Sequence, residues 1–334
     1  MPATLRDVAR HAGVSVTTAH RGINGKGELG EETRQRILDA VKALGYVPNQ
    51  TARSLVSGRS HTIGMIVTDN ASPVYAGIVR GVESVVKAAG YGLLLCNSAD
   101  DPAEALFCLE LLRAKQVDGV LITPVQSNLT ELDYLRDAQI PFVLLLRTFA
   151  ETSDDAVVTN NESGGRAATA LLVELGHQRI AHIAGPEHVS SARGRLAGYA
   201  KAMEAGGISI DPELIVHAPF TTHGGYTAAL ELLGRDERPS AIFASNDMQA
   251  VGVLKAAREL GLRIPDDLAL VGGDDIELAE FLEVPLTTFH QPAYEIGSQG
   301  AALLLSRLEG ESGEPRQIVM TPELIVRQSS GEHR

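Results

Sequence analysis

The sequence predicts an α/β protein in which an N-terminal helix-turn-helix headpiece of three helices precedes a two-lobed core built on doubly wound parallel sheets. Three observations lead to this prediction. At 334 residues the chain is longer than one ordinary domain. The first 45 residues contain three short amphipathic stripes separated by glycines. From residue 62 onward, apolar runs alternate with helical stripes, which is typical of parallel sheets with helices on both faces.

The composition favours a folded protein with an aliphatic core. Hydrophobic residues make up 44% of the chain, charged residues 21% and aromatic residues 4%. No apolar run approaches the roughly 18 to 20 residues that span a bilayer, and no secretory signal opens the chain. We therefore expect no membrane segment and a cytoplasmic location. Cys96 and Cys108 have no Cys-x-x-Cys spacing and the ten histidines are scattered, so we expect buried thiols, no metal and no cofactor.

The net charge of −13 conceals a difference between the two ends of the chain. Residues 1–60 contain nine basic and five acidic residues, a net charge of +4, whereas the remainder contains 20 basic and 37 acidic residues, a net charge of −17. Because salt screens charges over about 8 Å, a basic arm can bind phosphates although the distant body is acidic. The charge asymmetry therefore indicates that the N-terminus is the nucleic-acid-binding part.

The stripe from Leu5 to Ala12 predicts the first helix, which Gly13 ends. Thr4 and Asp7 have the spacing of a capping box at its start. Ser15 is placed to cap a second helix. A third stripe, from Ile37 to Leu44, stops at Gly45.

In a helix-turn-helix the second helix lies in the major groove and its early residues contact base edges. Val16 suits a thymine methyl and Thr17 suits either base type, so we expect this pair to set operator preference. The predicted DNA-binding residues in this part are Thr4, Ser15, Val16, Thr17, Thr18, His20, Arg21 and Asn24. The alternative is a three-helix module that binds another protein.

Pro48 ends the headpiece, and Asn49 can cap a short helical stretch that Gly58 stops. So short a helix is unstable alone in water, so it orders only when packed against a partner. We interpret it as a hinge that folds on DNA; a permanently flexible linker is the alternative. Its predicted DNA-binding residues are Asn49, Ala52, Arg53 and Leu55.

Motifs along essentially the whole chain resemble one protein family. They include Thr4-Leu5-Arg6-Asp7-Val8-Ala9, Gly45-Tyr46-Val47-Pro48-Asn49, Ser245-Asn246-Asp247, Pro285-Leu286-Thr287-Thr288 and Gln291-Pro292. The chain thus resembles the LacI/GalR family of bacterial transcription regulators. The resemblance implies a homodimer on a roughly palindromic operator, with Leu55 wedged into the minor groove. It also implies a core with the type I periplasmic-binding-protein fold and a small polar effector.

The chain departs from this family at several positions. The family usually has Val, Ser and Val where this chain has Ala19, His20 and Gly22, and a Ser cap where it has Gly30. A glycine inside a helix costs about 1 kcal/mol relative to alanine, so Gly22 predicts a less rigid reading helix.

Polar residues follow the apolar runs of the core, where ligands bind in open α/β sheets. Asn246 and Asp274 are the strongest candidates of this kind, whereas the adjacent Asp247 and Asp275 equally suit helix caps. The resemblance implies that Arg195, together with Asp274, binds a polar ligand. For the aromatic candidates Tyr75 and Phe220, ordinary core packing remains the alternative. The predicted effector-binding residues are Ser72, Tyr75, Arg195, Phe220, Asn246, Asp274 and Gln291. Leu146 and Gly273 replace a frequent Asp and an aromatic of the family, which argues against assigning a specific sugar.

These predictions give a headpiece over 1–47, a hinge over 48–60 and a core over 61–334. Within the core, lobe one covers about 61–159 and 291–319, and lobe two about 160–290 and 320–334. We expect a transcription regulator, most simply a repressor, that binds double-stranded operator DNA as a homodimer and a sugar or another small polar metabolite between the lobes. A transporter's solute-binding protein would need a signal peptide and no basic arm. An enzyme would need a nucleophile, base or cofactor motif, and none is recognisable.

Overall fold

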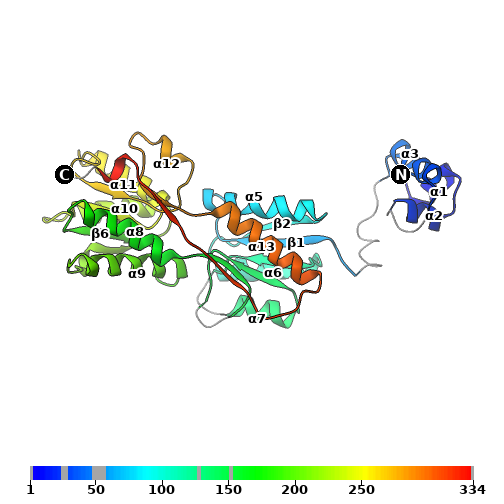
Figure 1. The fold of residues 1–334 in the computed structure, drawn as a ribbon, viewed down its shortest axis with the longest axis horizontal. Coiled ribbons are helices and arrows are strands. Elements are labelled where there is room, and N and C mark those ends of the chain that lie inside the picture. Colours follow the sequence, from blue (N-terminus) through cyan, green and yellow to red (C-terminus); the bar gives the residue numbers. More distant parts are fainter. Residues whose placement is uncertain (1–2, 24–28, 47–57, 126–128, 150–152, 332–334) are drawn as a thin grey trace. The chain divides into compact units, whose positions relative to one another are not determined.

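The computed structural model describes residues 3–23, 29–46, 58–125, 129–149 and 153–331. The chain divides into two compact units, Met1–Ser60 and His61–Arg334. The elements of both are labelled in Figure 1. The predicted limits of the hinge fall largely on residues 47–57, which lie outside the described residues, so these domain limits remain predictions.

The described residues of the first unit, 3–23, 29–46 and 58–60, form three helices, α1 (Leu5–Ala12), α2 (Val16–Ile23) and α3 (Glu31–Leu44). The predicted capping box is present: the Asp7 amide donates to Thr4 Oγ1 at 3.4 Å, and the Thr4 amide donates to Asp7 Oδ2 at 3.0 Å. Gly13 ends α1 with a φ of 67°, in the left-handed region that favours glycine. Val8 and Ile37 are fully buried in the small core between the helices.

Gly22 has a packing role in this unit. A Cβ atom at this position would lie 2.5 Å from Cδ1 of Ile37, on α3. Glycine therefore lets α2 approach α3 closely, which offsets its low helix propensity. Gly30, where the family has a serine, precedes α3 without a side-chain cap.

The second unit contains two parallel sheets. The first has the strand order β11-β5-β4-β3-β1-β2. Its strands are β1 (Thr62–Val67), β2 (Gly92–Asn97), β3 (Gly119–Ile122), β4 (Phe142–Leu145), β5 (Ala156–Thr159) and β11 (Gln317–Met320). The neighbouring helices are α5 (Pro73–Ala88), α6 (Pro102–Ala114), α7 (Thr130–Asp137) and α13 (Ala293–Leu308).

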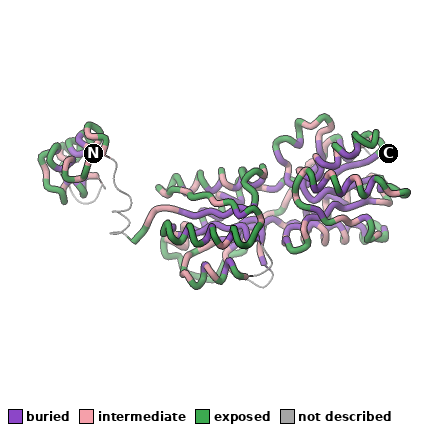
Figure 2. The backbone as a smooth tube through the Cα atoms, turned by 180° about the vertical axis from the view of Figure 1, so that it is seen from behind, coloured by how far each residue is buried: buried purple, intermediate pink, exposed green. Residues whose placement is uncertain are grey.

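Side chains of β1 alternate between two apolar layers on opposite faces of this sheet, as the twofold repeat of a strand requires. Met65 packs in the layer that includes Ile78 of α5 and Ile296 of α13. Ile66 packs in the layer that includes Leu109 of α6 and Leu132 of α7. Helices thus cover both faces, and the strands at the centre of the sheet are buried (Figure 2).

The second sheet has the order β7-β6-β8-β9, again with parallel pairs. Its strands are β6 (Ile180–Ala184), β7 (Ile215–His217), β8 (Ala241–Ala244) and β9 (Ala269–Val271). The associated helices are α8 (Asn161–Glu174), α9 (Ser190–Ala205), α10 (Thr222–Leu233), α11 (Asp247–Glu259) and the short α12 (Leu278–Phe281), with 3-10 turns at Pro212–Leu214 and Gln328–Ser330.

The chain passes between the two sheets three times. The first connection runs from β5 into α8, and the second from β10 (Thr288–His290) into α13. The third runs from β11 to β12 (Glu323–Ile325), which pairs antiparallel with β10. Because both sheets are parallel, their carboxyl ends carry the loops that line the space between them.

Neighbouring helices approach closely at glycines. A Cβ at Gly165 of α8 would lie 2.3 Å from the Arg195 carbonyl oxygen of α9, and one at Gly198 would lie 2.2 Å from the Glu162 carbonyl oxygen. Two further pairs of helices meet in the same way, through Gly81 and Gly297 in α5 and α13, and through Gly225 and Gly252 in α10 and α11. These glycines set the spacing of the helices that carry the pocket residues.

Among the described residues, no helix combines the length and the apolarity needed to cross a membrane. The same residues contain no group of three or more His, Cys, Asp or Glu side chains arranged to hold a metal ion. Cys108 is buried and Cys96 half-buried, both as free thiols. Burial raises the pKa of both thiols, that of Cys108 to about 11, so they are poor nucleophiles near neutral pH.

Candidate ligand pocket and DNA-reading helix

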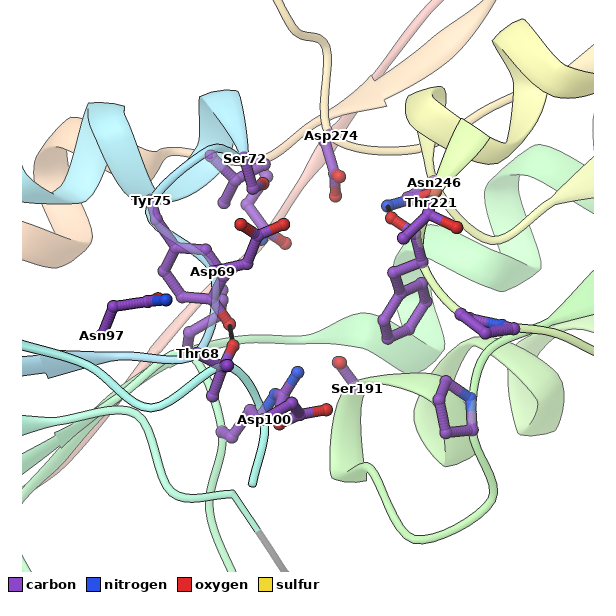
Figure 3. A pocket seen from close by; sticks show the side chains of 18 of the residues that line it. Thr68, Asp69, Ser72, Tyr75, Asn97, Asp100, Ser191, Thr221, Asn246 and Asp274 are labelled. Atoms are coloured by element: carbon purple, nitrogen blue, oxygen red, sulfur yellow. Dashed lines mark hydrogen bonds and ion pairs between the residues drawn. The ribbon is translucent and has the colours of Figure 1, made fainter. Parts of the chain in front are cut away.

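A pocket of about 420 Å³ lies between the loops at the carboxyl ends of the two sheets. Figure 3 shows its polar walls: Asp69, Ser72 and Tyr75 come from the first sheet and its helix α5, and Thr221, Asn246 and Asp274 from the loops of the second. The structure places all seven predicted effector-binding residues in this lining: Ser72, Tyr75, Arg195, Phe220, Asn246, Asp274 and Gln291.

Arg195 of α9 connects four separate segments around the pocket. Its Nη2 donates to Asp274 Oδ1 at 2.9 Å and to Gln291 Oε1 at 3.1 Å. Its Nη1 donates to the Ser245 carbonyl oxygen, and its Nε donates to Asn161 Oδ1 at 3.0 Å. Most of its donors are therefore used within the protein, so Arg195 lines the pocket and also fixes the side chains of Asp274 and Gln291 there.

Two buried aspartates, Asp274 and Asp247, interact electrostatically, and the first of them pairs with Arg195. Burial raises the pKa of Asp274, and Arg195 opposes the shift. Burial also raises the pKa of Asp247, and the charge of Asp274 adds to that shift. Asp247 lies outside the pocket, where Thr288 Oγ1 donates to its Oδ1 at 2.6 Å and the Ile276 amide donates to its Oδ2 at 2.9 Å. It is a structural residue at the first position of α11.

We expect Asp247→Asn to flatten the pH dependence of stability. A carboxyl group whose pKa is higher in the folded than in the unfolded state binds more protons when folded, so the free energy of unfolding falls as the pH rises through this range. For Asp247 the range extends from about 4 to about 8. Urea denaturation between pH 6 and pH 8.5 should give a decline in the wild type, by up to about 1.4 kcal/mol per pH unit, that is smaller in the variant. Exposed Asp137→Asn is the control; equal slopes in all three proteins would refute the prediction.

Asn246, which precedes α11, and Gln249 of α11 bind the loop that carries Phe220. Asn246 Oδ1 accepts from the Gln249 amide at 2.9 Å, so Asn246 caps the helix, and its Nδ2 donates to the Phe220 carbonyl oxygen at 3.3 Å. The Gln249 side chain donates to the carbonyl oxygens of Ala218 and Pro219 at 3.1 Å each. Asn246 is thus a helix cap that also lines the pocket, and these bonds fix the backbone of the loop that carries Phe220.

The opposite wall contains a second arginine that the sequence analysis did not single out. Arg147 is buried and donates to Asp100 Oδ1 at 2.6 Å. Nearby, Thr68 donates its hydroxyl proton to Tyr75 Oη at 2.6 Å. Arg147 directly follows Leu146, the position where the family has a frequent Asp, so that departure could have drawn attention to it.

The polar residues that follow the strands do not all reach the pocket. Asp69, Ser72, Asn97, Asn246 and Asp274 line it, whereas the side chain of Asp275 pairs with Arg327 at 2.8 Å and with His290 at 3.1 Å. Thr123 is fully buried. Consecutive residues after a strand thus point to different surroundings, one to the ligand space and the next to a structural ion pair.

Helix α2 presents an exposed polar face. Val16 is 43% exposed, and Thr17, His20 and Arg21 are exposed as well. Thr4 and Ser15 cap α1 and α2, since Ser15 Oγ accepts from the Thr18 amide at 3.1 Å, and Thr18 is hydrogen bonded to Ser15. The remaining predicted DNA-binding residues, Asn24, Asn49, Ala52, Arg53 and Leu55, lie outside the described residues.

Comparison with known proteins identifies the class. Residues 4–49 match the family described as bacterial regulatory proteins, lacI family, and residues 169–330 match the periplasmic binding protein-like domain. The ribose operon repressor of Escherichia coli K12 is 38% identical over 98% of this chain and 100% of its own length. The HTH-type transcriptional repressor PurR of Photobacterium profundum is 36% identical over 98% of each chain.

Solved structures agree with these sequence matches. The lac repressor dimer bound to operator and the anti-inducer ONPF has a TM-score of 0.89 and 28% identity, over 99% of this chain and 100% of that one. The complex of the transcriptional regulator CelR with cellobiose has a TM-score of 0.77 and 36% identity, over 98% and 99%. The matched families and relatives therefore define the class, a DNA-binding transcription regulator with a periplasmic-binding-protein-like core. The chain belongs to the lacI family of bacterial regulatory proteins.

Proposed function

We propose that this protein is a homodimeric repressor in the cytoplasm. Its affinity for operator DNA is controlled by a neutral sugar that binds in the pocket between the lobes. The observation that supports this proposal best is the presence of two arginine–aspartate contacts on opposite walls, Arg195–Asp274, which is buried, and Arg147–Asp100, in which the arginine is buried and the aspartate partly exposed. Each pair offers both donors and acceptors in charge-assisted form, which suits hydroxyl groups that donate and accept. Phe220 and Tyr75 supply faces for the apolar side of a sugar ring.

The charge of the pocket favours a neutral ligand. Among the residues that the structure describes, its lining contains the carboxylates Asp69, Asp100 and Asp274 and the two arginines Arg147 and Arg195. The pairing described above cancels four of these five charges and leaves Asp69. An anionic ligand such as a sugar phosphate would therefore meet a net negative site.

The sugar is tested by calorimetry on the full-length protein. D-ribose is the first probe because a relative of this chain is a ribose operon repressor. D-glucose tests whether a six-membered sugar ring binds, and cellobiose tests whether a disaccharide fits. D-ribose 5-phosphate tests the effect of negative charge on the ligand, and adenine tests whether a ligand without hydroxyl groups binds. We expect a neutral sugar to bind and to raise the melting temperature, and the phosphate to bind at least tenfold more weakly. Binding of adenine or of the phosphate in preference to every sugar would overturn the proposal.

The DNA side of the proposal rests on the exposed face of α2, and a dimer would present two such helices to an inverted repeat. We expect that exchanging Val16 and Thr17 together for other side chains changes the preferred operator in a binding selection. Replacing Arg21 with alanine should weaken binding by about 5- to 150-fold, the usual value of a base contact. Exposed Arg10→Ala on α1 is the matched control. An unchanged preferred sequence after the double exchange would remove the role assigned to Val16 and Thr17.

A further inference from the structure

The first connection between the two sheets is fixed by one buried amide side chain. Asn161, the first residue of α8, is 8% exposed and lies two residues after the end of β5. Its Oδ1 accepts from Arg195 Nε at 3.0 Å, and its Nδ2 donates to the Thr159 carbonyl oxygen at 3.1 Å. Because a guanidinium only donates and a carbonyl only accepts, the orientation of this amide is determined by its partners.

Between these two contacts lies Asn160, the residue at which the chain turns from β5 into α8, with φ −71° and ψ 80°. Its amide donates to the Met320 carbonyl oxygen at 2.8 Å, so it also contacts the end of β11, where the third connection begins. The Asn161 side chain spans this turn from α8 to the last residue of β5. It therefore restrains the backbone torsions that a rotation of one sheet against the other would change.

The other end of the same network reaches the ligand pocket. Arg195 shares its Nη2 between Asp274 and Gln291, and both of these residues line the pocket. Gln291 follows β10 in the second connection, so one guanidinium contacts residues of two connections. Asn161 itself is absent from the pocket lining. It can therefore be altered without removing a group that faces the ligand.

We propose that Asn161 couples the effector pocket to the first connection between the two sheets, from β5 into α8. It does so by joining Arg195 to the carbonyl group of Thr159 across the turn at Asn160. A ligand that engages Asp274 and Gln291 competes with or reinforces their bonds to Arg195, and Asn161 transmits the resulting shift to β5. Asn161 is thus a positioning residue that acts through Arg195. The ligand-dependent part of this inference rests on the proposed function.

Two substitutions distinguish the contact of Asn161 with Arg195 from its contact with the Thr159 carbonyl oxygen. Asn161→Asp keeps an acceptor for Arg195 but loses the donor to the Thr159 carbonyl oxygen, whereas Asn161→Ala loses both contacts. The control is Glu162→Gln on the same turn, because Glu162 forms an exposed ion pair with Lys201 and its side chain contacts neither Arg195 nor Thr159 in the contacts described.

The first measurement needs no ligand. In hydrogen exchange on the full-length protein, we expect the backbone amides of residues 159–164 to exchange at least tenfold faster in both Asn161 variants than in the wild type, with Glu162→Gln unchanged. Exchange at the wild-type rate in Asn161→Asp and Asn161→Ala would overturn the proposal. This comparison remains decisive if the wild type binds no D-ribose, a result that would refute only the proposed function.

The second measurement separates binding from coupling. We expect D-ribose to bind Asn161→Asp within about threefold of the wild-type affinity. The factor by which saturating D-ribose changes operator affinity, typically about 5 to 150 in coupled systems, should fall at least fivefold. If saturating D-ribose changes the operator affinity of Asn161→Asp by the wild-type factor, Asn161 only shapes the pocket and the proposal is overturned. This holds whether or not the variant has lost affinity for D-ribose.

Discussion

Replacing Arg195 with methionine should destabilise the core by about 3–5 kcal/mol and weaken sugar binding about 100-fold. Methionine keeps much of the apolar stem but removes the guanidinium, so the buried Asp274 carboxylate loses its ion-pair partner, and breaking a buried pair costs about this much. Gln291 and the Ser245 carbonyl oxygen lose donors at the same time. The loss of affinity corresponds to the value of a hydrogen bond to a charged group, about 1.5–3 kcal/mol.

Urea denaturation measures the stability change and calorimetry with D-ribose measures the affinity. Arg193→Met is the matched control, because Arg193 lies on the same helix, is exposed and donates only to the carbonyl oxygens of Glu187 and His188 in the contacts described. We expect the control to stay within about 1 kcal/mol of the wild type. Sugar binding within threefold of wild type in Arg195→Met would refute the role given to this arginine.

Replacing Gly198 with alanine should destabilise the core by about 3 kcal/mol, although the change adds a single methyl group. The new Cβ would lie 2.2 Å from the Glu162 carbonyl oxygen and 2.5 Å from the Arg166 amide nitrogen. Both are backbone atoms of α8, so no side chain can rotate away, and α8 and α9 must separate. Overpacking of this kind costs about 1–3 kcal/mol and sometimes more. Because Arg195 lies one turn earlier on α9, sugar affinity should fall as well.

Gly92→Ala is the control for this prediction. Gly92 is exposed on β2, and a Cβ there would have only one neighbour within 4 Å, the His61 carbonyl oxygen at 3.9 Å. Alanine at this position should therefore change the free energy of unfolding by less than about 1 kcal/mol. Equal stabilities of the Gly198 and Gly92 variants would show that the close approach of α8 and α9 is not required.

The local elements could be predicted from the sequence because their causes are local. The capping box of Thr4 and Asp7, the stop at Gly13 and the apolar run that forms β1 are each encoded within a few residues. The pocket residues Asn246 and Asp274 also followed from local order, because polar residues after parallel strands meet at one edge of a sheet.

The network of Arg195 could not be predicted in this way. Its partners Asn161, Ser245, Asp274 and Gln291 are 34, 50, 79 and 96 residues away in the chain. No periodicity relates positions at such separations. Packing of α8 against α9 brings Asn161 to Arg195, and the segments that follow β8, β9 and β10 bring Ser245, Asp274 and Gln291. The resemblance to a family indicated Arg195 as a ligand residue, whereas its contacts within the protein required the structure.

Two other features were missed for related reasons. Arg147 is buried in the pocket wall by its ion pair with Asp100, 47 residues earlier, and a charged residue after an apolar run ordinarily predicts an exposed position. Gly22 was expected to loosen α2, because helix propensity describes one helix alone. Its close approach to Ile37 of α3 depends on how the two helices pack.

The account is tested most directly by measuring operator affinity at one fixed salt concentration, with and without a saturating sugar that calorimetry has shown to bind. Salt must be held constant because phosphate contacts make DNA affinity strongly dependent on it. We predict that the sugar changes the affinity of the full-length protein about 5- to 150-fold, and that it has no effect on Arg195→Met. Equal operator affinity of the wild type with and without the bound sugar would contradict the account.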